Sequence, residues 1–252
     1  RHLSRETLGV GYHVPPSHES EIIGGNEADP HSRPYMAYLF INTDWGSEFA
    51  CGGFLIRDNV VMTAAHCNCK VAHIHVSLGA HNISADEWDR QVIRVRRRIP
   101  HPEYDAETLH NDIMLLQLEE KANLSCEVGP IRLAHRAVKK GAVCSVAGWG
   151  GTEPWAGSPT SSVLLEAKLK VMGDELCSRH GEGYRSSMMI CAGDPEEGKD
   201  TWQGDSGGPL VCNGKAQGIV SYGNEEMSPS GVYTNVIHYL PWIRKMLNKL
   251  DM

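Results

Sequence analysis

Short apolar or alternating runs, each bounded by Gly, Pro, Asn or Asp, follow one another along the chain from Tyr35 onward. Runs of this length, separated by turn residues, are typical of strands in an antiparallel all-β protein. We therefore predict strands within YMAYLFI (35–41), VVMTAA (60–65), HIHVSL (73–78), QVIRVRRRI (91–99), IMLLQL (113–118), CSVAGW (144–149), LLEAKLKV (164–171), PLVC (209–212), QGIVSY (217–222) and GVYTNV (231–236).

Only the C-terminal end has the periodicity of an α-helix. There the strand-like runs give way to apolar residues at i, i+3 and i+4 spacings, and a proline stands where a first helical turn tolerates it. The residues that predict this C-terminal helix are Leu240, Pro241, Ile243, Met246, Leu247 and Leu250.

Residues 1–21 contain too few apolar side chains to form an element, so we expect a disordered leader or pro-segment ahead of one domain, residues 22–252. The leader lacks the apolar region of a secretory signal peptide. No run in the chain approaches the roughly 18 apolar residues that a membrane helix needs. These patterns predict no membrane partner.

The chain is acidic, with 24 basic and 31 acidic residues in 252 and a formal charge of −7. The first 21 residues carry two basic and three acidic groups, so the remainder keeps a net charge of −6. A nucleic acid is therefore not an expected partner.

Eight cysteines are more than a cytosolic protein usually keeps unless they bind metal. They are widely spread, and the one close pair, Cys67-Asn-Cys69, does not have the spacing of a zinc knuckle. Disulfides are the better interpretation. The sequons at Asn82 and Asn123 predict glycosylation and also fit a secretory route.

Three separated motifs carry candidate chemistry: TAAHC at 63–67, NDIMLL at 111–116 and GDSGGP at 204–209. A serine hydroxyl is a poor nucleophile unless a neutral imidazole takes its proton and a carboxylate orients that ring. In this order and local context, the motifs resemble those of the chymotrypsin-like serine proteases. The resemblance extends from Ile22 to about Leu250.

The resemblance implies two antiparallel Greek-key β-barrels with a C-terminal α-helix, and an endopeptidase that needs no cofactor and no metal. His66, Asp112 and Ser206 would be the catalytic residues. Glycine before the serine lets backbone N–H groups turn inward, so Gly204 and Ser206 would donate to the carbonyl oxygen as it becomes negative.

The same resemblance implies three disulfides. Two cysteines remain: Cys69 and Cys126 either pair with each other or stay free. The implied pairs are Cys51–Cys67, which would anchor the loop bearing His66, Cys144–Cys212 and Cys177–Cys191.

Ile22-Ile23-Gly24-Gly25 resembles the start of the mature enzyme in this family, where the new α-amino group pairs with the acid before the catalytic serine, here Asp205. The intact chain would then be a zymogen. Glu21 before the cleavage point resembles granule proteases (granzymes, mast-cell chymases, cathepsin G), whose acidic dipeptide is trimmed by a dipeptidyl peptidase. That implies secretory granules or the extracellular space. A genuine long pro-segment is the alternative.

Asp200 stands six residues before Ser206, where trypsin-like enzymes hold a carboxylate at the base of the primary pocket. Gly223 and Gly231 match the glycines of the pocket wall. These residues predict cleavage after Arg or Lys, and Ser221 with Gly223 would pair with an extended substrate through the backbone.

One feature keeps other specificities open. A cysteine pair that braces this pocket in most relatives is missing, with Trp202 at one of its positions, so a chymase-like or mixed aromatic and basic preference is the alternative. A third hypothesis is a non-catalytic homologue that binds proteins, or a variant that is never activated. Such homologues usually lose the His, the Ser or the glycine turn, all of which remain here.

Expected partners are protein substrates, serpin-type inhibitors and, through RVRRR at 94–98, sulfated proteoglycan. Ten histidines after residue 21 would strengthen proteoglycan binding in an acidic granule. The loop after Gly79 does not match a calcium loop, because it lacks the first acidic ligand and has Arg90 where a second is expected.

Overall fold

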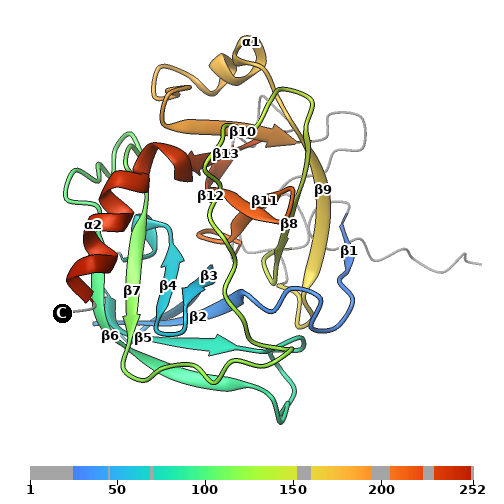
Figure 1. The fold of residues 1–252 in the computed structure, drawn as a ribbon, viewed down its shortest axis with the longest axis vertical. Coiled ribbons are helices and arrows are strands. Elements are labelled where there is room, and N and C mark those ends of the chain that lie inside the picture. Colours follow the sequence, from blue (N-terminus) through green and yellow to red (C-terminus); the bar gives the residue numbers. More distant parts are fainter. Residues whose placement is uncertain are drawn as a thin grey trace, which may run out of the picture.

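The computed structural model describes residues 25–44, 46–68, 71–151, 160–193, 205–223 and 230–250. These residues form thirteen strands that build two closed β-barrels (Figure 1). The all-β class, the barrels and the helix at the C-terminal end are therefore confirmed.

The first barrel has six antiparallel strands and is closed by the pairing of β2 with β5. Its residues come from a continuous part of the chain. In barrel order the strands are β2 (Met36–Thr43), β3 (Glu48–Arg57), β4 (Val60–Thr63), β7 (Met114–Leu118), β6 (Gln91–Pro100) and β5 (Val71–Leu78).

The second barrel also has six strands and closes through the pairing of β8 with β9, while a two-residue strand, β1 (Asn26–Glu27), extends the edge of β9. In barrel order they are β8 (Val143–Gly148), β9 (Leu165–Val171), β10 (Met189–Gly193), β13 (Ser230–Asn235), β12 (Lys215–Gly223) and β11 (Pro209–Cys212).

All ten runs predicted as strands contain a strand, but β1, β3 and β10 were not predicted. In β3, Gly52-Gly53 resembles a turn in the sequence. The structure gives another reason for the glycines, because a Cβ on Gly52 would lie 3.2 Å from the backbone oxygen of Asp205, and one on Gly53 3.0 Å from Val61. Glycine at these positions lets another part of the chain approach the strand closely.

The predicted C-terminal helix is α2 (Leu240–Leu250), and it buries Leu240, Ile243 and Leu247 in the same apolar core as the first barrel. Figure 1 shows α2 beside the strands of that barrel, although it follows a strand of the second. A second helix, α1 (Asp174–Cys177), was not predicted because four residues are too few for a helical pattern. Single 3₁₀ turns occur at Ala65–Asn68, Ser178–His180 and Val236–Tyr239.

Three disulfides join the predicted partners. Cys126 is free and exposed, whereas Cys69 lies outside the described residues, as do both termini. Within the part of the chain that the structure describes, no helix is long and apolar enough to span a membrane. The confirmed pairs are Cys51–Cys67, Cys144–Cys212 and Cys177–Cys191.

Candidate active site

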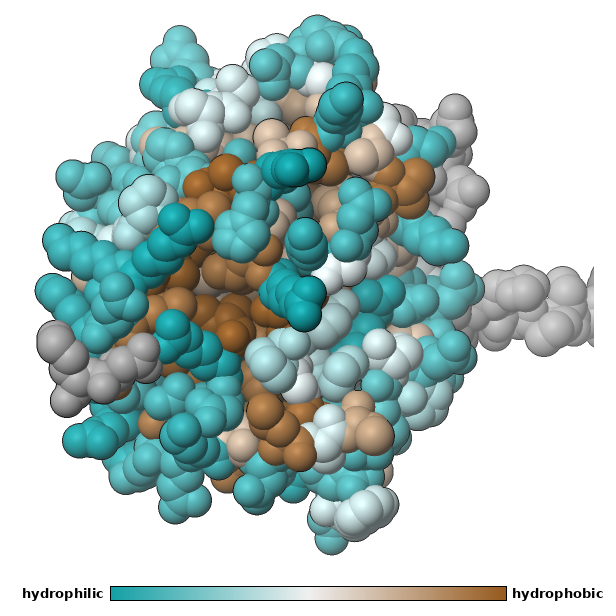
Figure 2. All heavy atoms as spheres, viewed as in Figure 1, coloured by the Kyte–Doolittle hydropathy of each residue, from teal (hydrophilic) through white to brown (hydrophobic). Residues whose placement is uncertain are grey.

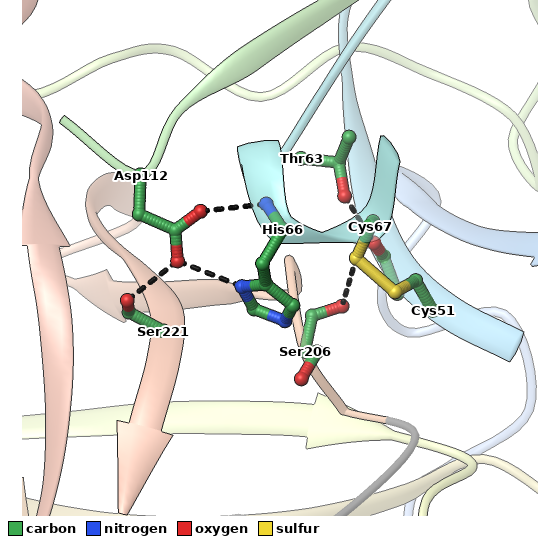
Figure 3. The surroundings of a disulfide bond; sticks show 8 residues. Cys51, Thr63, His66, Cys67, Asp112, Ser206 and Ser221 are labelled. Carbon is green, nitrogen blue, oxygen red and sulfur yellow. Dashed lines mark hydrogen bonds and ion pairs between the residues drawn. A yellow bond between two sulfur atoms is a disulfide. The ribbon is translucent and has the colours of Figure 1, made fainter. Parts of the chain in front are cut away.

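His66 and Asp112 come from the ends of neighbouring strands of the first barrel. His66 lies in the 3₁₀ turn that follows β4, and Asp112 stands two residues before β7, which pairs with β4. The Cys51–Cys67 disulfide ties this turn to β3 (Figure 3). Residues 46 positions apart in sequence are thereby brought into direct contact.

Two hydrogen bonds join the histidine to the aspartate. His66 Nδ1 lies 2.7 Å from Asp112 Oδ2, and the backbone N–H of His66 donates to Asp112 Oδ1 over 2.9 Å. Asp112 is fully buried, while the His66 side chain keeps 25% of its surface exposed. A carboxylate held in this way favours the tautomer with the proton on Nδ1, which leaves Nε2 able to accept one.

Two side chains of the second barrel complete the surroundings of Asp112. Ser221 Oγ in β12 donates to Asp112 Oδ2 over 2.6 Å, and Thr234 Oγ1 in β13 donates to the Asp112 backbone oxygen over 2.8 Å. From the sequence, only a backbone role is predicted for Ser221, and none for Thr234. Nothing in their local sequence marks these contacts, since both partners are more than 100 residues away.

Ser206 approaches His66 from the other side. Figure 3 shows its side chain on the side of the imidazole ring away from Asp112. Its backbone oxygen accepts a hydrogen bond from Gly52 N over 2.8 Å, and the next residue, Gly207, donates to Val220 O over 2.9 Å. The serine is therefore held by main-chain bonds to strands of both barrels.

Gly207 is required by the shape of this turn. Its φ is +86°, a conformation that side chains with a Cβ rarely adopt. A Cβ there would also lie 2.5 Å from Gly52 O and would overlap Thr63 Oγ1. The glycine after the candidate nucleophile thus lets the serine turn fit against β3.

Asp205 is the second buried carboxylate of the site, with 1% of its surface exposed. Its Oδ1 accepts a hydrogen bond from the Gly150 N–H over 2.9 Å. A Cβ on Gly148 or Gly150 would overlap this carboxylate. The glycines of Gly148-Trp149-Gly150 therefore make room for Asp205, a role that nothing in their local sequence indicates.

The two predicted wall glycines lie opposite each other. Gly223 pairs with Gly231 across β12 and β13. Beside them, Ser230 Oγ lies 2.9 Å from His180 Nε2. Burial lowers the pKa of His180 and raises the pKa of the neighbouring Tyr222, which favours the neutral form of both side chains.

Several predicted residues lie outside the described part of the chain. These are Ile22, whose amino group was expected to pair with Asp205, Asp200 at the expected pocket base, Trp202, and Gly204 as an oxyanion donor. Their assignments remain predictions from the sequence.

Among the described residues, one group of side chains has the spacing of metal ligands, and two of its members are already bonded. The sulfurs of Cys51 and Cys67 lie within 4.8 Å of a His66 ring nitrogen, but they are bonded to each other as a disulfide and are not thiolates. In the loop after Gly79, which does not match a calcium loop, the Arg90 guanidinium donates to Ile83 O over 2.9 Å and to Ala85 O over 3.3 Å. A cationic side chain thus bonds the oxygens of this loop.

Comparisons with known proteins find similar sequences and a similar fold. The family model described as Trypsin matches residues 22–243. Granzyme B of Homo sapiens is 51% identical over 241 residues, covering 94% of this chain and 95% of that protein, and Duodenase-1 of Bos taurus is 49% identical over 237 residues, covering 93% and 92%. A solved structure described as "Structure of GrC" superposes with a TM-score of 0.84 at 44% identity, covering 90% of this chain and all of that one.

Proposed function

Because the chain belongs to the trypsin family and is therefore a serine endopeptidase that acts on proteins, we propose that His66, Asp112 and Ser206 form its catalytic triad. The observation that carries this proposal is the 2.7 Å contact of His66 Nδ1 with the buried Asp112, with Ser206 on the other side of the ring (Figure 3).

In the proposed reaction Ser206 Oγ attacks the substrate carbonyl carbon while His66 Nε2 takes the hydroxyl proton. Asp112 holds the ring and stabilises the imidazolium. The imidazolium then protonates the leaving amine as the peptide bond breaks, which leaves an acyl-enzyme. Water attacks the acyl-enzyme in the same way, with His66 again as the base, and regenerates the serine. The N–H groups of Ser206 and Gly204 stabilise the anionic oxygen in each half.

A fluorophosphonate that reacts with an activated serine tests the triad. We expect stoichiometric labelling of the chain that begins at Ile22 and none of Ser206→Ala. Thermal unfolding of both proteins shows that the variant is folded. Labelling at a residue other than Ser206, or none in the trimmed parent, would contradict the assignment and favour the non-catalytic homologue.

The chain is further proposed to be a zymogen that is activated by cleavage before Ile22. Burial of Asp205 supports this, because a buried carboxylate is stabilised strongly by a cation that enters beside it. The incoming α-ammonium group would order the loop that ends at Ser206. The intact chain should therefore react with the fluorophosphonate far more slowly than the chain trimmed to Ile22, and equal rates would exclude this activation.

For specificity, cleavage after Arg or Lys is proposed, with Asp200 as the partner of the basic side chain. The opposed glycines Gly223 and Gly231 support an open pocket wall. A panel of fluorogenic peptides on the trimmed enzyme tests this, with Asp200→Ser as the matched variant that should lose the preference for Arg. A parent that prefers Phe or Tyr would instead establish the chymase-like alternative, which the missing cysteine pair of this region favours.

Secretory granules or the extracellular space are the proposed location, and sulfated proteoglycan and serpin-type inhibitors are proposed partners. Three disulfides support an oxidising compartment. Arg94, Arg96, Arg97 and Arg98 are all exposed on β6.

Two histidines of β5 lie next to this arginine cluster: His75 pairs with Arg94 across the strands, and His73 Nδ1 lies 3.3 Å from an Arg94 nitrogen. The chain carries ten histidines after residue 21, and histidines as a class gain charge on acidification, so a heparin column should retain the protein more strongly at pH 5.5 than at pH 7.4. Unchanged elution would contradict this role for the histidines.

A further inference from the structure

A hollow of about 560 Å³ lies between α2 and the segment that connects the two barrels, residues 130–138. Its floor is apolar and includes Ile131, Leu133, Ile243 and Leu247. We call it the α2 groove. Figure 2 shows apolar side chains at the bottom of a hollow on this side of the molecule, with strongly hydrophilic side chains around it.

A second hollow of about 370 Å³, which we call the polar recess, adjoins the α2 groove, because His135 and Lys215 line both. Gln217 also lines the recess, with only 3% of its surface exposed, and its Nε2 has no hydrogen-bond partner among the described residues. The Gln217 residue also lines a further hollow, which lies beside α1. A buried amide without a partner costs free energy, so a turn of this side chain that brings Nε2 to an acceptor in the recess is favoured.

The charged side chains of both hollows have one sign. Arg132, Arg244 and Lys215 line the α2 groove, and Arg136 joins Lys215 in the polar recess, while no acidic side chain lines either within the described residues. This basic local charge occurs in a chain whose net charge is −7. The favoured occupant is therefore an anion.

The connecting segment offers few backbone groups to a peptide. The N–H groups of Ile131 and Ala134 donate to Leu55 O and Ala216 O, and Ala216 N–H donates to Arg132 O, each over 2.9 Å. These groups already pair within the protein, so they cannot also bond an extended peptide that adds as a strand. A ligand with one polar end and an unbranched apolar body fits the two hollows better.

We propose that the α2 groove and the polar recess together bind a single-chain amphipathic carboxylate, that is, a fatty acid. The carboxylate lies in the polar recess, where the Lys215 ammonium group donates to it, and the Gln217 amide, whose Nε2 is shielded from solvent, turns towards it to donate as well. The hydrocarbon chain follows the apolar floor of the α2 groove along Leu247 and Ile243. The combined volume falls in the range of small-molecule sites.

The test is titration of the full chain with dodecanoate below its micelle concentration, by calorimetry and by NMR of a ¹³C-labelled carboxylate. We expect saturable 1:1 binding that weakens about tenfold or more in Lys215→Gln and in Gln217→Leu, because each removes a hydrogen bond to a charged group. Lys168→Gln, which removes an exposed lysine of β9, is the matched control and should bind like the parent.

Dodecanol and dodecyltrimethylammonium distinguish this site from general adsorption to apolar surface. Either one binding as tightly as dodecanoate, or unchanged affinity in both variants, would overturn the proposal. So would tighter binding of an octapeptide of alternating Asp and Leu. If Gln217→Leu unfolds, Lys215→Gln decides alone, since Lys215 is exposed. Ser206→Ala in the full chain should bind dodecanoate normally, so failure of this proposal and failure of the triad are separate results.

Discussion

In the first barrel, His66 and Asp112 are joined by two hydrogen bonds between their own atoms, whereas in the second barrel Ser206 is held by bonds of its backbone. The proposed acid–base pair thus depends on side-chain chemistry, and the position of the proposed nucleophile depends on a turn that only glycine permits at Gly207. Asp112 links the two barrels because Ser221 of the second donates to it.

This difference predicts two kinds of failure. Changing a polar atom of the first-barrel pair should stop catalysis and leave the fold intact, since few packing contacts are lost. Adding a single methyl group to the second-barrel turn should disturb the fold itself, since backbone atoms of β3 stand in its way. Mutations that alter either the His66–Asp112 pair or the turn at Gly207, but not both, test this difference.

The largest effect is expected from Asp112→Asn. The amide cannot accept the Nδ1 proton of His66 as the carboxylate does, so the ring adopts the wrong tautomer and kcat should fall about 10⁴-fold. The melting temperature should change little, and KM for a peptide substrate should stay close to the parent value. A loss of less than tenfold would mean that Asp112 does not orient the base.

Gly207→Ala should destabilise the protein by about 3 kcal/mol, from an unfavourable backbone conformation and the overlap with Gly52 and Thr63. Gly214→Ala is the matched control, because Gly214 has φ +68° with nothing within 4 Å of an added Cβ. It should cost only about 1 kcal/mol. Urea unfolding of both variants measures the difference, and equal losses would show that the contacts of Gly207 do not matter.

Ser221→Ala should lower kcat about tenfold, the equivalent of a lost hydrogen bond to a charged group. Asp112 would keep both bonds from His66, so the effect should be much smaller than that of Asp112→Asn. Ser178→Ala, which removes an exposed hydroxyl from the same half of the molecule, is the control. A kcat equal to that of the control would make Ser221 a packing residue only.

The smallest effect concerns pH and stability. Because burial lowers the pKa of His180 in the folded state, the unfolded chain binds its proton more readily. Stability should therefore fall as the pH drops below the ordinary histidine pKa, and His180→Gln should reduce this dependence. Urea midpoints at pH 7.5 and 5.0 for both proteins measure it. A parent that is equally stable at both values, or a variant with the same pH dependence, would contradict this role.

Much of the fold followed from local patterns. Each of the ten apolar runs contains a strand, and the spacing of Leu240, Ile243 and Leu247 identified α2. The strands that are not predicted from the sequence have physical reasons for it. No strand is predicted at β3, where Gly52-Gly53 interrupts the apolar pattern. The requirement for glycine there comes from the approach of other chain segments, including the backbone at Asp205, which the sequence does not show.

The sequence by itself determined the chemistry that is available: a histidine, an aspartate and a serine in motifs distinctive enough to indicate the family, with cysteines whose pairing the resemblance implied. Only the tertiary structure decided what surrounds them. The hydroxyl of Ser221 on Asp112, the room for Asp205 beside Gly148, and the buried amide of Gln217 in a basic recess all depend on residues that lie far apart along the chain. Motifs report local backbone and side-chain chemistry, whereas burial and hydrogen-bond partners arise when the two barrels close and pack together.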